Sequence, residues 1–501
     1  MQRRDPDDDD AAITPGAAWR PIATRWWVLG IYSYISALQS LLWMTWSSVP
    51  DASKTYLGTD DATLDLWLNF GPIAYCGSVT LAAWLLLARP DGVRLSVLLG
   101  AGLCAAAALV RCAPLVLPPA QRAAALGAVA LGQFLNAAVA PLVVASPAFL
   151  SLLWFPASQR NLATAVGNVA NAVGRGVGFF LGPALVSASG DLPTLLLVEL
   201  GLAVLPLVCA LAYYPALPEE PPSPAAAAEF ASLRARARGG RRVGGNGDSD
   251  DGSGAKEAPA ESVEDASSDG HGAPDEALLG AAGAGAAPPR SLGASLARAA
   301  ADVLGVLRTP GLLLLTAAGG LQMAVYGAWS GTLPSVLSPR FSNADAGALG
   351  CVNTFAGVAG GLAVGALTDH PSLQHSLKAA TVGLCVASAA LFGALALALG
   401  PAAVPSVASG LSFGALAALC AAAGGLRGGA DPLFFELSAE LSHPAPAGTA
   451  GAVLTFWYHL ALVAALSVPP AAMAWSMVAM SAALGVAAAL LLPVAVSYQR
   501  R

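Results

Sequence analysis

Long apolar stretches, bounded by proline, glycine or charged residues, dominate this chain. A helix needs about twenty consecutive apolar residues to cross a bilayer. Six such stretches precede a polar gap, at 26–49, 64–88, 95–117, 123–153, 161–186 and 192–214, and six follow it, at 311–336, 347–367, 378–399, 402–426, 447–468 and 471–493. We therefore predict twelve transmembrane helices in two sets of six. The stretch at 123–153 is long enough to continue beyond the bilayer.

The gap between the two sets is rich in Pro, Gly, Ala, Ser and acidic residues. Such a segment cannot bury enough apolar surface to fold by itself. The expected organisation is a tail at 1–25, a six-helix bundle at 26–214, a disordered linker at 215–308, a second six-helix bundle at 309–493 and a tail at 494–501. Residues 291–308, at the end of the linker, could form an amphipathic helix.

Composition agrees with a membrane protein and excludes several other classes. Hydrophobic residues make up 56% of the chain and charged residues only 11%, with a mean hydropathy of +0.63, whereas soluble domains are about a quarter charged. The seven cysteines lie in or beside apolar stretches, which argues against a disulfide framework or a metal site. There is no basic surface for nucleic acid and no phosphate-binding glycine loop. We expect a monomer that is not an enzyme and holds no cofactor or metal.

Lysine and arginine predict the orientation. With the N-terminus in the cytoplasm, twenty of the 25 basic residues fall in the tails, the linker and the inner loops, and Arg427 is counted among these loop residues. The outer loops hold Lys54, Arg122 and Arg340. Because positive residues accumulate on the cytoplasmic side, we expect both termini and the linker to be cytoplasmic.

The two halves share a spaced pattern of polar and aromatic residues. The first predicted helix and the seventh carry it with a constant offset of 283 residues, as Gln39, Trp43 and Trp46 and as Gln322, Tyr326 and Trp329. This repeat and the six-linker-six layout resemble the major facilitator architecture, an all-α polytopic fold of twelve transmembrane helices in two pseudo-symmetric bundles. In that architecture the solute binds near the midplane between the halves. We expect these six residues to bind solute, although aromatic residues in membranes also form interfacial belts.

Ionisable residues inside predicted helices are functional candidates because burying charge in a membrane is costly. Arg111 and Glu199 lie near helix ends, where structural pairing is an equal alternative to a role in transport. Arg175 lies deeper, on a glycine-rich helix, and structural pairing with the carbonyl groups of a helix end is an equal alternative. His459 is a candidate solute ligand, with a simple packing role as the alternative.

Several motifs indicate gating and close packing. The loop after the eighth helix reads Gly365-Ala-Leu-Thr-Asp369, and the loop after the second helix, from Ala88 to Arg94, is a degenerate version that keeps the Gly and the Arg. An ordinary charged turn is the alternative interpretation. An Asp in such a loop can cap a neighbouring helix and hold a gate shut. We assign gating or coupling to Asp91, Arg94, Asp369, Glu436, Glu440, Arg111 and Arg175. A stripe of small residues that lets another helix approach closely is formed by Gly174, Gly178, Gly182 and the following Pro183.

One region resembles a specific family. The stretch Pro432-Leu-Phe-Phe-Glu436, continuing to Gly448, is similar to the junction of helices ten and eleven in the FLVCR-related transporters, and most similar to the disrupted-in-renal-carcinoma protein branch. The motif Gln39-x-x-x-Trp43-x-Thr-Trp, Val110-Arg-Cys-x-Pro and Tyr326-x-x-Trp-Ser-Gly add to the resemblance.

The resemblance implies transport of small organic solutes, among them choline, ethanolamine, vitamin-B6-type molecules and haem, with protons as a candidate coupling ion. It also implies that Trp43 and Tyr326 are aromatic pocket residues and that His459 replaces a pocket glutamine. A second pocket glutamine is replaced by Ala172, with Asn171 beside it as a solute-binding candidate. That departure puts choline itself in doubt.

Together these observations predict a secondary active or facilitative transporter that works by alternating access on a small cationic or aromatic organic solute. We expect it in the plasma membrane or an endolysosomal membrane. The alternative from another class is a transporter-like receptor or sensor that binds a solute without moving it. A channel is a weaker third interpretation, because no stretch resembles a selectivity filter.

Overall fold

The computed structural model describes residues 23–88, 91–144, 146–224, 226–227, 229–231, 233, 301, 303–337, 341–368, 376–399, 412–442, 447–467 and 475–496. Regular structure in these ranges is helical. The first bundle contains the long helices α1 (Thr24–Ser48), α3 (Asp61–Ala88), α4 (Gly92–Arg111), α6 (Arg122–Ala137), α9 (Ala157–Leu185) and α10 (Leu192–Ala212). The second contains α14 (Pro310–Leu337), α15 (Asn343–Thr368), α16 (Leu377–Leu399), α17 (Phe413–Ser442), α18 (Ala447–Leu466) and α19 (Ser476–Leu491).

Short helices connect or extend the long ones. They are α2 (Pro50–Leu57), α5 (Ala113–Val116), α7 (Ala140–Val144) and α8 (Pro147–Trp154), with 3₁₀ turns at Pro119–Gln121 and Ser189–Asp191. The α2 helix ends at Gly58, whose φ of +60° suits glycine. The predicted stretch at 123–153 corresponds to α6, α7 and α8, so the helical path is divided into three pieces.

Length and composition fit a membrane protein. Eight described helical stretches are long and apolar enough to cross a bilayer, and they involve α1, α4, α6, α10, α14, α15, α16 and α17. The α3 and α9 helices contain 28 and 29 residues, which at 1.5 Å per residue also exceeds the hydrocarbon thickness of about 30 Å.

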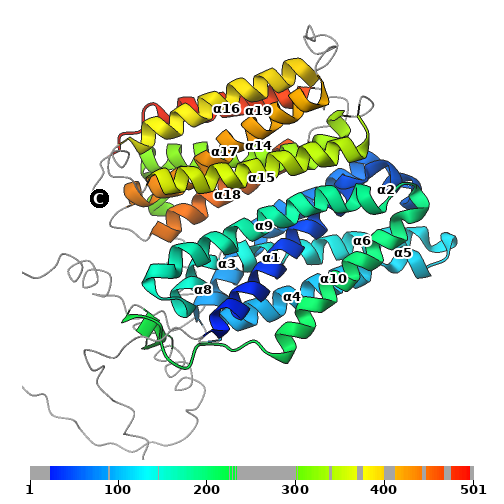
Figure 1. The fold of residues 1–501 in the computed structure, drawn as a ribbon, viewed down its shortest axis with the longest axis horizontal. Helices are drawn as coiled ribbons and strands as arrows, with labels where there is room; N and C mark the ends of the chain where they lie inside the picture. Colours follow the sequence, from blue (N-terminus) through cyan, green and yellow to red (C-terminus); the bar gives the residue numbers. More distant parts are fainter. Residues whose placement is uncertain are drawn as a thin grey trace, which may run out of the picture.

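The twelve long helices described here form two bundles that lie side by side (Figure 1). Short connections make successive helices antiparallel, so all of them end at one of two faces. We call the face where α1 begins the Thr24 face and the face where α1 ends the Ser48 face. The short helices α2 and α5 lie at the Ser48 face, at the right of Figure 1.

The tenth predicted helix needs correction. Its predicted range was 402–426, but α17 runs from Phe413 to Ser442, and residues 402–411 lie outside the described ranges. Arg427 therefore lies in the middle of a helix and not in a cytoplasmic loop. The helix continues through this charged stretch because Asp431, one turn later, pairs with Arg427 at 3.1 Å.

Ordered structure also extends past residue 214. Ala226, Phe230 and Leu233 are buried against the core of the first bundle, which includes Val28 and Tyr214. Arg160 at the start of α9 donates a hydrogen bond to the Ser223 hydroxyl. This differs from the expectation of a disordered segment from residue 215 onward, since these apolar side chains give the start of the linker a docking face. The expected helix at 291–308 falls mainly outside the described residues.

Glycine allows two helix pairs to approach closely. A Cβ at Gly174 would lie 1.8 Å from the Ala37 carbonyl oxygen of α1, and one at Gly182 would lie 2.1 Å from the Ser48 hydroxyl. In the second bundle a Cβ at Gly360 of α15 would lie 2.0 Å from the Gly425 carbonyl oxygen of α17. The stripe on α9 thus packs against α1, with Gly178 facing Met44 between its two ends.

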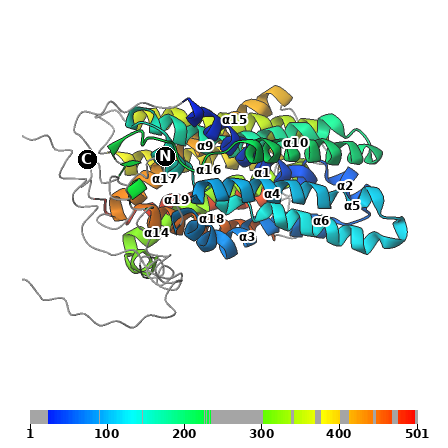
Figure 2. The same cartoon turned by 90° about the horizontal axis from the view of Figure 1, so that it is seen from below.

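One apolar cluster among the described residues joins the two bundles. Its members from the first bundle are Trp43, Met44, Leu68 and Phe179, and those from the second include residues of α14, α15 and α18. They lie at the middle of the helices and toward the Ser48 face. Toward the Thr24 face the buried clusters belong to one bundle each. Figure 2 shows α3 beside α18 where the bundles meet. The bundles are thus held together chiefly in the Ser48 half.

Candidate functional site

Two arginines and two aromatic rings meet between the bundles. The guanidinium carbon of Arg175 on α9 lies 5.5 Å from the Trp43 ring centroid on α1 and 4.8 Å from the Tyr326 ring centroid on α14. Arg427 on α17 lies 4.4 Å from the same Tyr326 ring. We call these four residues the central cluster. It brings together Trp43, Tyr326 and Arg175 from the predicted set, and it draws on both bundles.

Polar groups of the first bundle position Arg175. Its Nε lies 3.5 Å from the Ser40 hydroxyl, and a terminal nitrogen lies 3.4 Å from the Asn171 side-chain oxygen. Asn171 in turn donates to the Gln39 side-chain oxygen at 3.2 Å and to the Ser36 carbonyl at 3.1 Å. The hydrogen-bonded side chains of Gln39 and Asn171 therefore lie beside Arg175. Trp43 is fixed separately, since its indole N–H donates to the Leu68 carbonyl at 3.1 Å.

The second bundle supplies a different set of supports. Arg427 pairs with Asp431, and its backbone carbonyl accepts a hydrogen bond of 2.8 Å from the buried Gln322 amide. The Tyr326 hydroxyl lies 2.7 Å from the Thr354 hydroxyl on α15. The cluster thus contains two guanidiniums, and one carboxylate lies beside it.

His459 contacts the other bundle directly. Its ring stacks on Tyr75 of α3, with centroids 3.7 Å apart and an angle of 8° between the planes. Tyr458 packs edge-on against the same imidazole at 4.4 Å. The Nδ1 atom is 2.8 Å from the Thr455 carbonyl one turn earlier on α18. His459 therefore forms part of the bundle interface.

Two predicted aromatic residues lie away from the Arg175–Tyr326 contact. Trp329 is buried in the apolar cluster shared by the bundles. Trp46 packs edge-on against Trp67 at 5.5 Å, and its indole N–H donates to the Gln133 side chain at 3.2 Å. Trp46 thus belongs to the interior of the first bundle.

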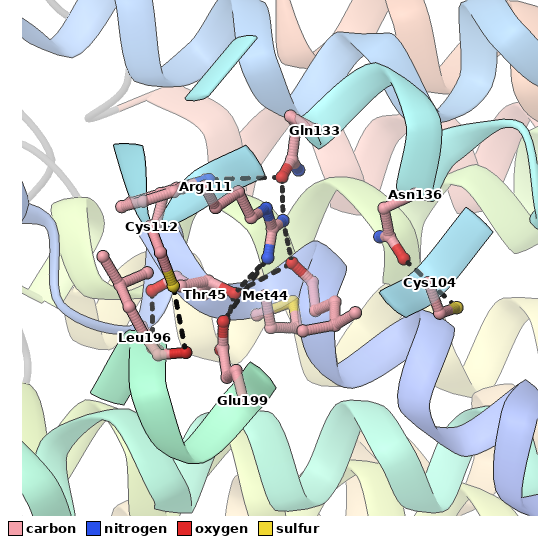
Figure 3. Close-up of polar contacts among 12 residues, drawn as sticks. Met44, Thr45, Cys104, Arg111, Cys112, Gln133, Asn136, Leu196 and Glu199 are labelled. Atoms are coloured by element: carbon pink, nitrogen blue, oxygen red, sulfur yellow. Dashed lines mark hydrogen bonds and ion pairs between the residues drawn. The ribbon is translucent and has the colours of Figure 1, made fainter. Parts of the chain in front are cut away.

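Trp46 borders a buried polar network around Arg111, drawn in Figure 3. Arg111 pairs with Glu199 at 3.4 Å and contacts the Thr45 hydroxyl at 3.1 Å, and Thr45 donates to Glu199 at 2.7 Å. Arg111 also donates to the Gln133 side chain. The side chains of Arg111 and Glu199 are 0% and 2% exposed. Four helices, α1, α4, α6 and α10, meet at this network, and all belong to the first bundle.

Four of the predicted gating residues, Asp91, Arg94, Glu436 and Glu440, lie near the Thr24 face, whereas Arg111 lies at the Ser48 end of α4 and Arg175 in the central cluster. Asp91 precedes α4 and Arg94 is exposed in its first turn. Glu436 is exposed and Glu440 is buried in the last turns of α17. Asp369 lies outside the described residues. Pro183 lies inside α9 near its Ser48 end, where it approaches the position of Gly347 on α15.

A cavity of about 170 Å³ lies elsewhere, between α14, α18 and α19. Its lining is mostly aliphatic, with Thr332 and Ser476 as the hydroxyl-bearing members. None of the four residues of the central cluster lines it. Aromatic and charged side chains from both bundles meet in the central cluster and not in this cavity, which makes the central cluster the candidate solute site. Among the described residues no group of three or more His, Cys, Asp or Glu is placed to hold a metal ion.

Sequence reasoning missed Asp431 and Tyr75. Asp431 was hidden because the predicted helix ended at 426. Continuing the helix would have revealed an Arg-x-x-x-Asp pair within the membrane, a spacing that places both side chains on one face. Tyr75 carries no comparable signal, since its importance comes from a partner in the other bundle.

The amino-acid sequence is similar to a family profile and to named proteins. Residues 28–466 match the sequence profile of the Major Facilitator Superfamily. A protein named solute carrier family 49 member 4 homolog from Xenopus tropicalis is 27% identical over 481 residues, covering 91% of this chain and 87% of that protein. The choline/ethanolamine transporter FLVCR1 of Mus musculus is 31% identical over 180 residues, covering 36% of this chain and 30% of that protein.

A solved structure shares the fold. The xylose transporter XylE from E. coli, in an inward open conformation, aligns with a TM-score of 0.61 and 14% identity, covering 95% of this chain and 98% of that one. At this identity the likeness concerns the fold alone.

Proposed function

The chain belongs to the Major Facilitator Superfamily, and on this premise we propose that it moves a small organic solute across a membrane by alternating access. It acts in this proposal as a secondary active or facilitative transporter. The observation that carries the proposal is the central cluster, in which Trp43 and Arg175 of one bundle meet Tyr326 and Arg427 of the other. A solute held there contacts both bundles, so its binding can be coupled to their relative movement.

The distribution of contacts supports a closed Ser48 half and a separable Thr24 half. The shared apolar cluster joins the bundles from the middle of the helices toward the Ser48 face. A transport cycle requires these contacts to break while others form near the Thr24 face. Gly347 and Gly350 of α15 fit closely against Phe179 of α9. This seam is a natural place for the bundles to separate.

Charge supports placing the Thr24 face in the cytoplasm. Described basic residues at or near that face are Arg25, Arg94, Arg160, Arg308 and Lys378. The Ser48 face carries Lys54 and Arg122 together with the acidic residues Asp51, Asp60, Asp61, Asp191 and Asp345. Moving Arg427 out of the loops leaves the asymmetry of basic residues intact. In this orientation both termini are cytoplasmic and the structure is closed toward the outside or the lumen.

The named relatives and the central cluster together indicate which solutes to test. The FLVCR1 relatives are named choline/ethanolamine transporters, which makes these two amines test solutes here. We keep the proposal that the solute is aromatic, because Trp43 and Tyr326 supply ring faces in the central cluster. Protons remain the proposed coupling ion, and the plasma membrane or an endolysosomal membrane the proposed location. We also propose that the protein works as a monomer.

The direct test measures flux with purified protein in liposomes. Uptake of radiolabelled choline, ethanolamine and pyridoxine is compared with that of protein-free liposomes at pH 5.5 and 7.5. The same solutes are offered to the variant Leu68→Cys/Gly331→Cys. In this variant a bifunctional methanethiosulfonate can join the two cysteines through reducible disulfide bonds and lock the Ser48 half. In the structure a Cβ at Gly331 would lie 3.7 Å from the Leu68 side chain. The half-exposed native cysteines are replaced beforehand, and each single variant is the control.

Alternating access predicts that cross-linking abolishes uptake and that a reductant restores it. The single variants should keep uptake after the same treatment. A receptor or sensor would instead bind a test solute without accumulating it, with or without the cross-link. A cross-linked protein that still carries solute at full rate would contradict alternating access.

A further inference from the structure

The positively charged side chains of the bundles differ in whether a carboxylate pairs with them. Among the arginines of the described helices, Arg111 and Arg427 are buried and Arg175 is half-buried. Arg111 pairs with Glu199 at 3.4 Å, and Arg427 pairs with Asp431 at 3.1 Å. Arg175 has no carboxylate within ion-pair distance among the described residues. Its polar contacts are with neutral groups, namely the Ser40 hydroxyl at 3.5 Å, the Asn171 side-chain oxygen at 3.4 Å and the Tyr458 side chain.

A charge in the membrane interior normally has a partner. Asp431 acts on Arg175 at longer range, but its carboxylate oxygens lie 3.1 and 3.3 Å from Arg427. Two guanidiniums and one carboxylate therefore leave one positive charge uncompensated in the cluster. Both guanidiniums lie within 5 Å of a single ring, that of Tyr326. Such a site attracts an anion.

The same geometry disfavours a cation. An organic cation binds aromatic residues over the ring faces. Here the Tyr326 ring already has Arg175 at 4.8 Å and Arg427 at 4.4 Å, and the Trp43 ring has Arg175 at 5.5 Å. An incoming ammonium group would have to displace one of these guanidiniums or lie beside it. Arg175 and Arg427 thus occupy the ring faces with which a cationic solute would interact.

We propose that the solute is an aromatic anion whose carboxylate pairs with Arg175. This inference rests on the proposed function and names the substrate class of the same site. The planar guanidinium can donate two parallel hydrogen bonds to a carboxylate. The attached ring would then pack beside Trp43 and Tyr326, and the solute would supply the negative partner that Arg175 lacks.

The first test measures the charge of the site without requiring transport. Ala172 lies three residues before Arg175 on α9 and is half-buried, so a cysteine there shares its side of the helix. The variant Ala172→Cys is made in full-length protein without the half-exposed native cysteines. It is treated with an anionic and a cationic methanethiosulfonate, and the ratio of the two rates is compared with that of a small free thiol.

We expect the anionic reagent to be favoured and Arg175→Gln to lower the ratio at least ~5-fold, because one nearby unit charge is removed. Arg175→Lys should keep the ratio. Arg122→Gln, which removes an exposed charge at the Ser48 face, is the matched control and should leave the ratio unchanged. Preference for the cationic reagent, an unchanged ratio in Arg175→Gln, or no reaction with either reagent would overturn the proposal.

The second test uses three solutes that share one ring. Nicotinate, nicotinamide and 1-methylnicotinamide present an anion, a neutral molecule and a cation. Each is tested at millimolar concentration for slowing the reaction of the Ala172→Cys variant with a neutral thiol reagent. Nicotinate should protect best, and Arg175→Gln should remove that advantage. Equal effects of the three, including none, or strongest protection by the cation would count against the proposal. Failure of the transport function would appear in the liposome assay and leave these rates unaffected.

Discussion

Tyr75 and His459 stack face to face across the bundle interface, with ring centroids 3.7 Å apart and planes 8° from parallel. Tyr75 belongs to α3 of the first bundle and His459 to α18 of the second. This contact lies at mid-height, beside the central cluster. It ties the two bundles together in the conformation described here.

Removing the imidazole should therefore loosen the closed Ser48 half. Aromatic pairs contribute about 0.5–1.5 kcal/mol beyond the area they bury, which corresponds to about 2–13-fold in an equilibrium. We expect His459→Ala to slow cross-linking of Leu68→Cys/Gly331→Cys by a factor in that range. His459→Phe keeps a flat ring and should cross-link at nearly the parent rate. If the alanine variant cross-links as fast as the parent, the stack does not support closure.

Much of the fold could be predicted because apolar length alone defines a membrane helix. Eleven of the twelve predicted stretches overlap the described long helices with ends that differ by a few residues, allowing for the division of the fourth. The tenth failed because the predicted helix ended before Arg427 and Asp431. The predicted end of the helix depended on the cost of burying a charge in the membrane, and the ion pair between Arg427 and Asp431 lowers that cost.

The aromatic part of the site was predictable because it repeats, and Arg175 was predictable because it is a charge inside a predicted helix. Trp43 and Tyr326 came from matching positions in the two halves, and both lie in the central cluster. The matching pair Trp46 and Trp329 lies in the core. Tyr75 could not be found, since its contact depends on how α3 and α18 align across two bundles. Spacing along one helix carries no information about that alignment.

Close packing of α1 against α9 gives a second prediction. A methyl group at Gly174 would overlap the Ala37 carbonyl oxygen, at 1.8 Å. Overpacking of this kind costs about 1–3 kcal/mol, so Gly174→Ala should lower the thermal stability of the purified protein. Gly102 on α4 has no atom within 4 Å of its Cβ position. Gly102→Ala should be neutral or slightly stabilising. Equal melting temperatures for the two variants would contradict the packing argument.

The N-terminus of α3 gives a pH-dependent prediction. Hydrogen bonds from the Thr63 hydroxyl, at 2.6 Å, and from its backbone N–H, at 2.9 Å, lower the pKa of the Asp60 carboxyl below its ordinary value of 3.8. A lowered pKa in the folded state gives stability that is present above pH 3.8 and is lost as the pH falls through the folded value. Asp60→Ala should therefore melt earlier than the parent at pH 6, and the difference should shrink near pH 3. Asp60→Asn, which can still cap the helix, is the control. A difference that does not change with pH would exclude the carboxylate as its source.

The network around Arg111 gives the last prediction. It tests whether the pair of Arg111 and Glu199 only stabilises the first bundle or also takes part in transport. Arg111 and Glu199 are almost completely buried and their partners all belong to the first bundle (Figure 3). Removing one member of a buried pair leaves an uncompensated charge and costs about 3–5 kcal/mol. Arg111→Met and Glu199→Leu should each lower the melting temperature strongly.

The double variant should recover most of the loss, since apolar side chains of similar size can replace a buried ion pair. If the pair is a brace, the double variant keeps uptake within about threefold, a change of less than about 1 kcal/mol in the barrier. Melting curves and liposome uptake measured on the same four proteins complete the cycle. A double variant that is as stable as the parent but carries no solute would instead assign Arg111 and Glu199 to coupling, because stability and flux would then have been separated at one site.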